Sequence, residues 1–322
     1  MLAVQAVRAG GPEVLEAVDL ERPAPGPGQI LVRHEAIGLN FIDTYQRSGL
    51  YPMRYPAVLG QEGAGVVEAL GEGVTRFTPG ERVAYNGQGG GYAQFNVVSA
   101  SRAVALPEGV SAEIAAASLL KGMTTEFLVR RCHSLKASET ILVHAAAGGV
   151  GSLLVQWAKA IGATVIGTVG SENKAALARE LGCDHVVLYR HEDVAARVRE
   201  ITGGAGVSVA YDAVCKDTFE ATLASLGRRG LFVSFGNASG PAPAVEPLRL
   251  MRGGSLFLTR PTMADYTATP AELDESASQL FAMIASGKLR IEIGQRFKLA
   301  DARQAHEALE GRSTIGATVL LP

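Results

Sequence analysis

The segment His144-Ala-Ala-Ala-Gly-Gly-Val-Gly151 constrains the fold of this chain more than any other. An apolar, strand-like run precedes it at Thr140–Val143, and a helix-like apolar run follows it at 152–161. Glycines between a strand and a helix permit a sharp turn, expose backbone N–H groups at the helix start and allow the helix to pack close to the strand. This context predicts a dinucleotide site. The residues expected at the pyrophosphate are Gly148, Gly149 and Val150.

The strand after the glycines indicates which dinucleotide binds. A site for NAD usually has Asp or Glu at the end of this strand, where the carboxylate binds the ribose 2′-hydroxyl. Here the strand ends at Val169 and is followed by Gly170, Ser171 and, three residues later, Lys174. A hydroxyl and a cation suit a 2′-phosphate, so the sequence predicts NADPH. In the alternative interpretation Lys174 is only solvated and Glu172 is the displaced acid.

Length and charge limit the class of protein. A chain of 322 residues favours two domains over one. The net charge of −2 gives no reason to expect nucleic acid or an anionic membrane as a partner. The N-terminal residues lack a signal-peptide pattern, and no apolar run reaches the roughly 18 residues of a spanning helix. We therefore expect a cytoplasmic protein.

Two different sequence patterns divide the chain into two domains. From about residue 120, strand-like and helix-like runs alternate, which predicts a doubly wound parallel sheet of the Rossmann type. Before that point, short strand-like runs and glycine clusters at 60–73 and 87–91 predict a mainly β domain, a twisted antiparallel barrel. A helix at 273–286 and a strand at 316–321 are expected to rejoin it. We predict a catalytic domain at 1–123 and 262–322, an NADPH-binding domain at 124–261, and a cleft between them.

Several longer motifs in a fixed order carry a resemblance to a known family. They lie at residues 10–15, 38–45, 47–51, 145–151, 167–170, 229–236 and 259–261. With them the chain resembles the NADPH-dependent quinone oxidoreductases, or zeta-crystallin type, of the medium-chain dehydrogenase/reductase superfamily. The resemblance covers essentially the whole chain and implies a GroES-like fold for the catalytic domain. It also accounts for Ala146, which stands where the usual fingerprint has its first glycine.

The resemblance also bears on whether the chain binds a metal ion. Zinc alcohol dehydrogenases of this superfamily have a Cys after the third strand and a His in a Gly-His-Glu motif. This chain has Asn40 in the first segment and Gln61 in the second, and its three cysteines are too few for a structural zinc lobe. We therefore expect no metal and predict hydride transfer from NADPH to a quinone. The alternatives are a reductase of α,β-unsaturated carbonyls (enones or alkenals) and a non-catalytic NADPH-binding protein.

The resemblance implies roles for several residues of the first domain. Asn40 is expected near the nicotinamide ribose and Tyr45 near the acceptor, with Asp43 in the same active-site segment. In the alternative interpretation Asn40 only caps a helix that begins at Phe41. Further candidates are Tyr51, which lines the pocket or covers the core, Gln61, which binds ligand or only its neighbours, and Lys121.

Other residues are expected at the cofactor or in structural roles. The resemblance places Thr124 and Lys121 near the nicotinamide, Tyr189 and Arg312 near the adenosine phosphate, and Phe235, Gly236 and Ser239 along the nicotinamide half. Asp212 is predicted to be a structural cap and His144 a satisfied core histidine. Cys132, Cys183 and Cys215 are predicted to be buried small apolar residues. We predict a homodimer, because residues 255–259 are expected to form an apolar edge strand and the family that the chain resembles is commonly dimeric.

Overall fold

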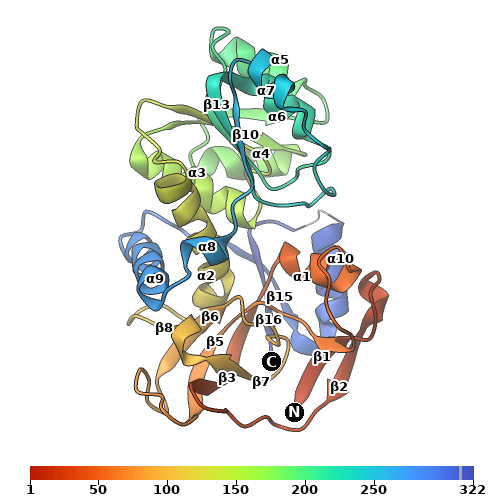
Figure 1. Cartoon of the computed structure of the whole chain (residues 1–322), viewed down its shortest axis with the longest axis vertical. Helices are drawn as coiled ribbons and strands as arrows, with labels where there is room; N and C mark the ends of the chain where they lie inside the picture. Colours follow the sequence, from red (N-terminus) through yellow and green to blue (C-terminus); the bar gives the residue numbers. More distant parts are fainter. Residues whose placement is uncertain (312–313) are drawn as a thin grey trace. The chain divides into compact units, whose positions relative to one another are not determined.

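The computed structural model describes residues 1–311 and 314–322 (Figure 1). The chain divides into two compact units. The first unit comprises Met1–Met123 and Thr267–Pro322, and the second comprises Thr124–Tyr266. The second unit is thus inserted in the sequence of the first.

A six-stranded sheet forms the centre of the second unit, with the strand order β11-β10-β9-β12-β13-β14. Its strands are β9 (Thr140–Val143), β10 (Thr164–Val169), β11 (His185–Leu188), β12 (Val207–Asp212), β13 (Leu226–Ser234) and β14 (Phe257–Thr259). All neighbouring strands are parallel. Counted along the chain, this is the order 3-2-1-4-5-6 of dinucleotide-binding sheets, with its switch point between β9 and β12. The predicted doubly wound fold is confirmed.

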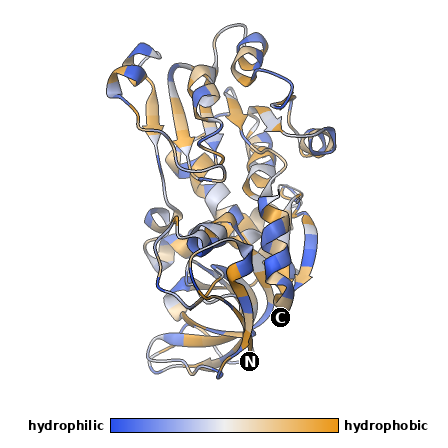
Figure 2. Ribbon diagram, turned by 90° about the vertical axis from the view of Figure 1, so that its right-hand side faces the viewer, coloured by the Kyte–Doolittle hydropathy of each residue, from blue (hydrophilic) through white to orange (hydrophobic). Residues whose placement is uncertain are grey.

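Helices connect these strands and lie on both sides of the sheet (Figure 1). They are α3 (Gly149–Ile161), α4 (Glu172–Glu180), α5 (Val194–Ile201), α6 (Phe219–Ser225) and α7 (Pro247–Arg252), and the short helix α8 (Met263–Tyr266) follows the last strand. Val198 of α5 and Leu223 of α6 pack with Leu142, Ile166 and Phe232 of the strands. Figure 2 shows these strands mainly in apolar colours, as expected for a sheet that is covered on both faces.

The first unit is built mainly of antiparallel strands. A seven-stranded sheet has the order β15-β16-β3-β5-β6-β8, and β7 also pairs with β3. A second sheet has three strands in the order β2-β1-β4. The bounds are β1 (Leu2–Ala6), β2 (Leu15–Asp19), β3 (Gln29–Leu39), β4 (Ala57–Val58), β5 (Glu62–Leu70), β6 (Arg82–Asn86), β7 (Phe95–Ser99), β8 (Ala103–Ala105), β15 (Ile293–Lys298) and β16 (Ala317–Leu321). The expected antiparallel arrangement holds except for β15 and β16, which run parallel.

The helices of the first unit show where the sequence interpretation was incomplete. They are α1 (Phe41–Ser48), α2 (Ala112–Phe127), α9 (Pro270–Ala285) and α10 (Ala302–Glu310), and α2 continues past Met123 into the second unit. The expectation of strands and turns up to about residue 120 is wrong for α2. Its middle is a run of alanines and leucines that are buried on nearly every side, so no amphipathic period marks it as a helix.

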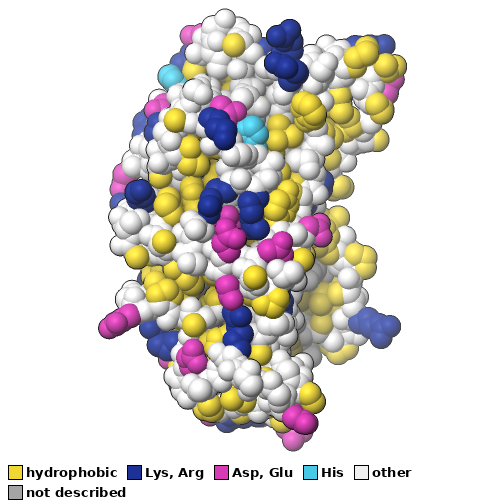
Figure 3. Space-filling model, turned by 60° about the vertical axis from the view of Figure 1, so that its left-hand side comes forward, with side chains coloured by type: hydrophobic (Ala, Val, Ile, Leu, Met, Phe, Trp, Pro, Cys, Tyr) yellow, Lys and Arg dark blue, Asp and Glu magenta, His cyan; other side chains and the backbone are white. Residues whose placement is uncertain are grey.

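The surface of the molecule carries charges of both signs. Figure 3 shows Lys and Arg side chains interspersed with Asp and Glu over the face that it draws. Among the helices of residues 1–311 and 314–322, none is long and apolar enough to cross a membrane.

Candidate functional site

The carboxyl ends of the parallel strands gather the candidate cofactor residues of the second unit. Because these strands run in one direction, the segments that follow β9, β10, β12 and β13 emerge at the same edge of the sheet. The predicted residues in these segments are Gly148, Gly149, Val150, Gly170, Ser171, Phe235, Gly236 and Ser239. Ligands of open parallel sheets bind at this edge, beside the switch point.

The turn after β9 is compact and leaves no room for side chains. Gly148 is the N-cap residue of α3, and its N–H donates to Ala145 O at 2.8 Å. Ala145 adopts a left-handed conformation with φ of 52°. A Cβ atom on Gly151 would lie 2.1 Å from the same carbonyl oxygen, so only glycine fits there. The N-cap Gly148 offers no side chain to the backbone N–H groups at the start of α3, as a pyrophosphate site requires.

The end of β10 forms a second small cradle. Ser171 is the N-cap residue of α4, and its side chain makes no capping hydrogen bond. Lys174 lies in the first turn of the same helix. Tyr189, directly after β11, is 38% exposed, and its hydroxyl lies 2.6 Å from the position that a Cβ on Gly170 would take. A hydroxyl, a cation and an exposed aromatic ring beside a bare backbone fit the adenosine 2′-phosphate end of NADPH.

The segments after β12 and β13 are tied to each other through the backbone. Phe235 N–H donates to Asp212 O at 2.9 Å, and Ser239 Oγ donates to Val214 O at 2.8 Å. A Cβ on Gly236 would lie 2.5 Å from Ala213 O. Thr124, in α2, places its Oγ1 4.0 Å from Met263 Sδ. The two loops thus form one packed wall at the carboxyl edge of the sheet.

Two polar residues of the second unit are structural, as predicted. The Asp212 carboxylate accepts hydrogen bonds from Val214 N and Cys215 N and from the hydroxyls of Thr218 and Thr222. His144 lies one residue past β9 and has both ring nitrogens within 3.0 Å of threonine hydroxyls, those of Thr168 and Thr222. Burial lowers the pKa of His144, which favours the neutral ring.

The first unit holds its candidate residues around α1. Asn40 is the N-cap residue of α1, and its backbone N–H donates to Asp43 Oδ2 at 2.9 Å. The side-chain Nδ2 of Asn40 donates to Glu62 Oε2 at 2.8 Å. Asn40 therefore has the capping position that the alternative interpretation gave it, while its amide nitrogen is directed to a second buried carboxylate.

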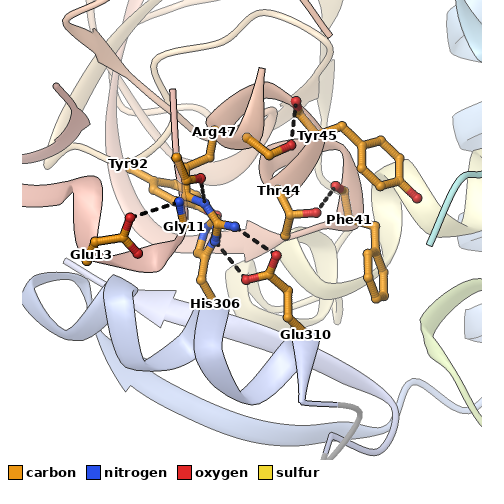
Figure 4. Close-up of polar contacts among 11 residues, drawn as sticks. Gly11, Glu13, Phe41, Thr44, Tyr45, Arg47, Tyr92, His306 and Glu310 are labelled. Atoms are coloured by element: carbon orange, nitrogen blue, oxygen red, sulfur yellow. Dashed lines mark hydrogen bonds and ion pairs between the residues drawn. The ribbon is translucent and has the colours of Figure 1, made fainter. Parts of the chain in front are cut away.

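A chain of polar contacts fixes the inner face of α1 (Figure 4). Tyr92 OH donates to Asp43 Oδ2 at 2.9 Å and lies 3.0 Å from His306 Nε2. Arg47 Nη1 lies 3.0 Å from His306 Nδ1, and its guanidinium binds both carboxylate oxygens of Glu310 at 2.9 and 2.7 Å. Burial raises the pKa of Asp43 to about 7 and lowers that of His306 to about 3. The carboxylate of Asp43 is thus buried and accepts the hydrogen bond from the backbone N–H of Asn40.

Aromatic rings from α1 and the segment after it lie close together. The Tyr45 and Tyr51 rings meet edge to face at 5.3 Å between centroids, and Phe41 lies 6.2 Å from Tyr45. In Figure 4 the Phe41 and Tyr45 rings point away from the Arg47–Glu310 ion pair. Gln61 Nε2 donates to Gln46 Oε1 of the same helix at 3.0 Å. Such a cluster of rings is suited to a flat, electron-poor ligand.

Lys121 lies beside a buried carboxylate that the sequence analysis missed. Its Nζ is 3.4 Å from Glu62 Oε2, and the side chains of Lys121 and Glu62 are 7% and 0% exposed. Burial raises the pKa of Glu62, while the Lys121 ammonium and the Asn40 amide oppose that rise. The only signal in the sequence is an acidic residue at the start of an otherwise apolar and glycine-rich strand, next to Gln61.

Other expectations have mixed outcomes. Cys183 and Cys215 are buried as predicted, but Cys132, the last residue of the helix Leu128–Cys132, is only partly buried. Arg312 lies outside the described residues. In the part of the chain that the structure describes, no three His, Cys, Asp or Glu side chains gather closely enough to hold a metal ion.

Comparisons with known proteins agree with this geometry. Residues 26–108 match the family model of the alcohol dehydrogenase GroES-like domain, and residues 149–282 match that of the zinc-binding dehydrogenases. A quinone oxidoreductase of Pseudomonas aeruginosa is 53% identical over 99% of both chains. A 2-haloacrylate reductase of a Burkholderia species is 42% identical over 98% of this chain and 97% of its own. The crystal structure of Escherichia coli quinone oxidoreductase with NADPH has a TM-score of 0.98 and 46% identity over 100% of both chains.

Proposed function

The chain belongs to the quinone oxidoreductase family of the medium-chain dehydrogenase/reductase superfamily, and on that premise we propose that it reduces quinones with NADPH without a metal. The geometry at the end of β10 carries the cofactor part of this proposal. Full-length similarity to proteins named quinone oxidoreductases supports the acceptor part. The reaction is a net hydride transfer from NADPH to the quinone, completed by a proton from water.

In the second unit, the start of α3 and the cradle after β10 would hold the two phosphate-bearing parts of NADPH. Gly149 and Val150 present backbone N–H groups to the pyrophosphate, and Gly148, whose own N–H is bonded to Ala145 O, forms the bare turn beside them. Gly170, Ser171 and Lys174 take the 2′-phosphate, beside the ring of Tyr189. We assign the nicotinamide half to Thr124, Phe235, Gly236 and Ser239. Arg312 is retained as a candidate for the phosphate.

In the first unit, α1 and its neighbours would hold the acceptor. The rings of Tyr45 and Tyr51 stack with or enclose the quinone, and Gln61 positions Gln46 beside them. Asn40 and Lys121 offer hydrogen bonds at the reacting end. Asp43 acts through Asn40, whose backbone it holds. NADPH supplies the reducing power, so these residues need only bind, orient and stabilise charge.

A second acceptor class has specific support. The relative that is named a 2-haloacrylate reductase covers nearly the whole chain, and a haloacrylate is an electron-poor alkene conjugated to a carboxyl group. The same site could therefore reduce α,β-unsaturated carbonyls. Steady-state kcat/KM for a naphthoquinone and for an alkenal, both with NADPH, separates the two: a value for the alkenal at least tenfold higher would replace the quinone assignment.

The cofactor assignment is tested at Lys174. We expect Lys174→Ala to raise the Kd of NADPH by roughly 10- to 100-fold and to leave the Kd of NADH within twofold, because a charge-assisted contact to the 2′-phosphate is lost. Arg179→Ala, in the last turn of the same helix, is the matched control and should change neither constant. Equal binding of both cofactors by the wild type, unchanged in Lys174→Ala, would contradict the 2′-phosphate site.

We also propose that the chain forms a homodimer through β14. This strand ends the strand order of the six-stranded sheet, and Phe257 on it is 59% exposed. Met251 and Leu248 of the nearby α7 are 59% and 46% exposed. An apolar edge strand is suited to pairing with its own copy across a two-fold axis. Sedimentation equilibrium tests this proposal, and a monomer mass at micromolar concentration would refute it.

A further inference from the structure

Glu62 occupies a space that the fold leaves open for it. It begins β5 and pairs across the sheet with Gly38 of β3. A Cβ on Gly38 would lie 2.4 Å from Glu62 Oε2 and 2.1 Å from Ala116 O of α2. Any side chain at position 38 would thus displace the carboxylate from between β3 and α2.

Three donors from two different elements converge on this carboxylate. Oε1 accepts from Leu120 N at 2.5 Å, and Oε2 accepts from Asn40 Nδ2 at 2.8 Å and from Lys121 Nζ at 3.4 Å. Glu62 is 0% exposed and Lys121 is 5% exposed. A buried carboxylate is costly unless it is paired and hydrogen-bonded, and here both conditions are met.

One oxygen atom therefore links the two donors that the proposed function places at the reacting end. Asn40 comes from the segment after β3 and Lys121 from the interior of α2, so no local structure holds them together. Oε2 of Glu62 contacts the nitrogen of each. Removing its charge would take away the carboxylate that Lys121 Nζ contacts in the protein interior.

We propose that Glu62 is a positioning residue that holds the Lys121 ammonium beside the Asn40 amide, where the ammonium offsets negative charge on the acceptor. This inference rests on the proposed function. The quinone takes up a hydride, with its electron pair, from NADPH and becomes a hydroquinone monoanion, and NADP⁺ is left. A proton from water then completes the hydroquinone. A fixed cation next to the acceptor oxygen stabilises the monoanion as it forms.

The test is a double-mutant cycle with Glu62→Gln and Lys121→Met. We expect each single variant to lower kcat for a naphthoquinone at least tenfold, with the Kd of NADPH within twofold of the wild type. Because Glu62 acts through Lys121, the double variant should lose no more than Lys121→Met alone. Glu126→Gln, a buried glutamate paired with Arg130 and Arg131, is the matched control and should retain kcat.

The outcomes separate this inference from the proposed function. If the wild type reduces no quinone with NADPH, both are overturned. If the wild type is active and Glu62→Gln keeps its kcat, or if the losses in the double variant multiply, only the role of Glu62 is overturned. Should Glu62→Gln fail to fold by circular dichroism, Glu62→Asp replaces it in the same cycle. Its carboxylate is withdrawn by one methylene group, and we expect a loss of at least fivefold that Lys121→Met again masks.

Discussion

The candidate sites of the two units are built from different kinds of chemical group. In the second unit the site is made largely of backbone, namely glycines, strand ends and the starts of α3 and α4, with Lys174 as its charged side chain. In the first unit it is made around buried ionisable side chains, among them Asp43, Arg47, Glu62 and Lys121. Backbone groups keep their dipoles at any pH, whereas buried charges depend on each partner.

The polar interior of the second unit supports this contrast. The hydroxyl oxygen of Thr222 lies 3.0 Å from His144 Nε2 and 3.0 Å from Asp212 Oδ2, so it joins these two buried residues. In the first unit, by comparison, a buried guanidinium reaches a carboxylate 263 residues away in the sequence. The second unit should thus respond mainly to changes of shape, and the first to changes of charge.

The largest expected effect comes from a change of shape at Gly151. Gly151→Ala places a Cβ 2.1 Å from Ala145 O, a backbone atom that cannot move without opening the turn before α3. We expect the Kd of NADPH to rise at least a thousandfold, about 4 kcal/mol. Isothermal titration calorimetry measures it. Gly148→Ala, with its Cβ 3.1 Å from the same oxygen, should cost clearly less, and equal losses would contradict steric exclusion as the cause.

A change of charge at Arg47 should come next. Arg47→Met keeps the length of the side chain but removes its bonds to Gly10 O, His306 and Glu310. Breaking a buried ion pair costs about 3 kcal/mol or more, and the partly exposed carboxylate of Glu310 can rehydrate, which favours the lower value. Urea unfolding followed by circular dichroism measures the loss.

The single tryptophan turns this variant into a direct test of the contrast. Trp157 lies buried in α3 of the second unit, so its fluorescence follows that unit. We expect the urea midpoint of the Trp157 fluorescence transition to be nearly the same in Arg47→Met and the wild type. The transition followed by circular dichroism should broaden and begin at a lower urea concentration in the variant. If both transitions shift together, the units unfold as one cooperative system and their stabilities cannot be compared separately.

The same contrast explains what the sequence could predict. The second unit alternates strand and helix with short-range signals, and its strand β9 lies at the predicted residues Thr140–Val143. The strand-end residues follow directly from that topology. The contacts of Arg47 and Glu62, by contrast, join residues 22 to 263 positions apart. No periodicity or local motif carries such pairing, so the contacts of Glu62, Tyr92 and His306 could be found only from the folded chain.

The smallest expected effect, and the most specific to the first unit, is a pH dependence at Asp43. Its pKa is raised by burial to about 7 in the folded chain, from near 3.8, so between these values the folded state holds a proton that the unfolded state has lost. Stability from this proton is therefore present at low pH and is lost as pH rises through 7. Asp43→Asn cannot titrate.

The quantity to measure is the unfolding free energy of the wild type minus that of Asp43→Asn. Between pH 5.5 and 7 we expect this difference to fall by about 1.5 kcal/mol. The pKa of His306, lowered by burial to about 3, acts with the opposite sign, since stability there is lost as pH falls below about 6.5. Because both proteins contain His306, its contribution largely cancels in the difference. A difference that stays flat over this range would mean that Asp43 is ionised in the folded chain, and the buried charges of the first unit would then be as insensitive to pH as the backbone site of the second.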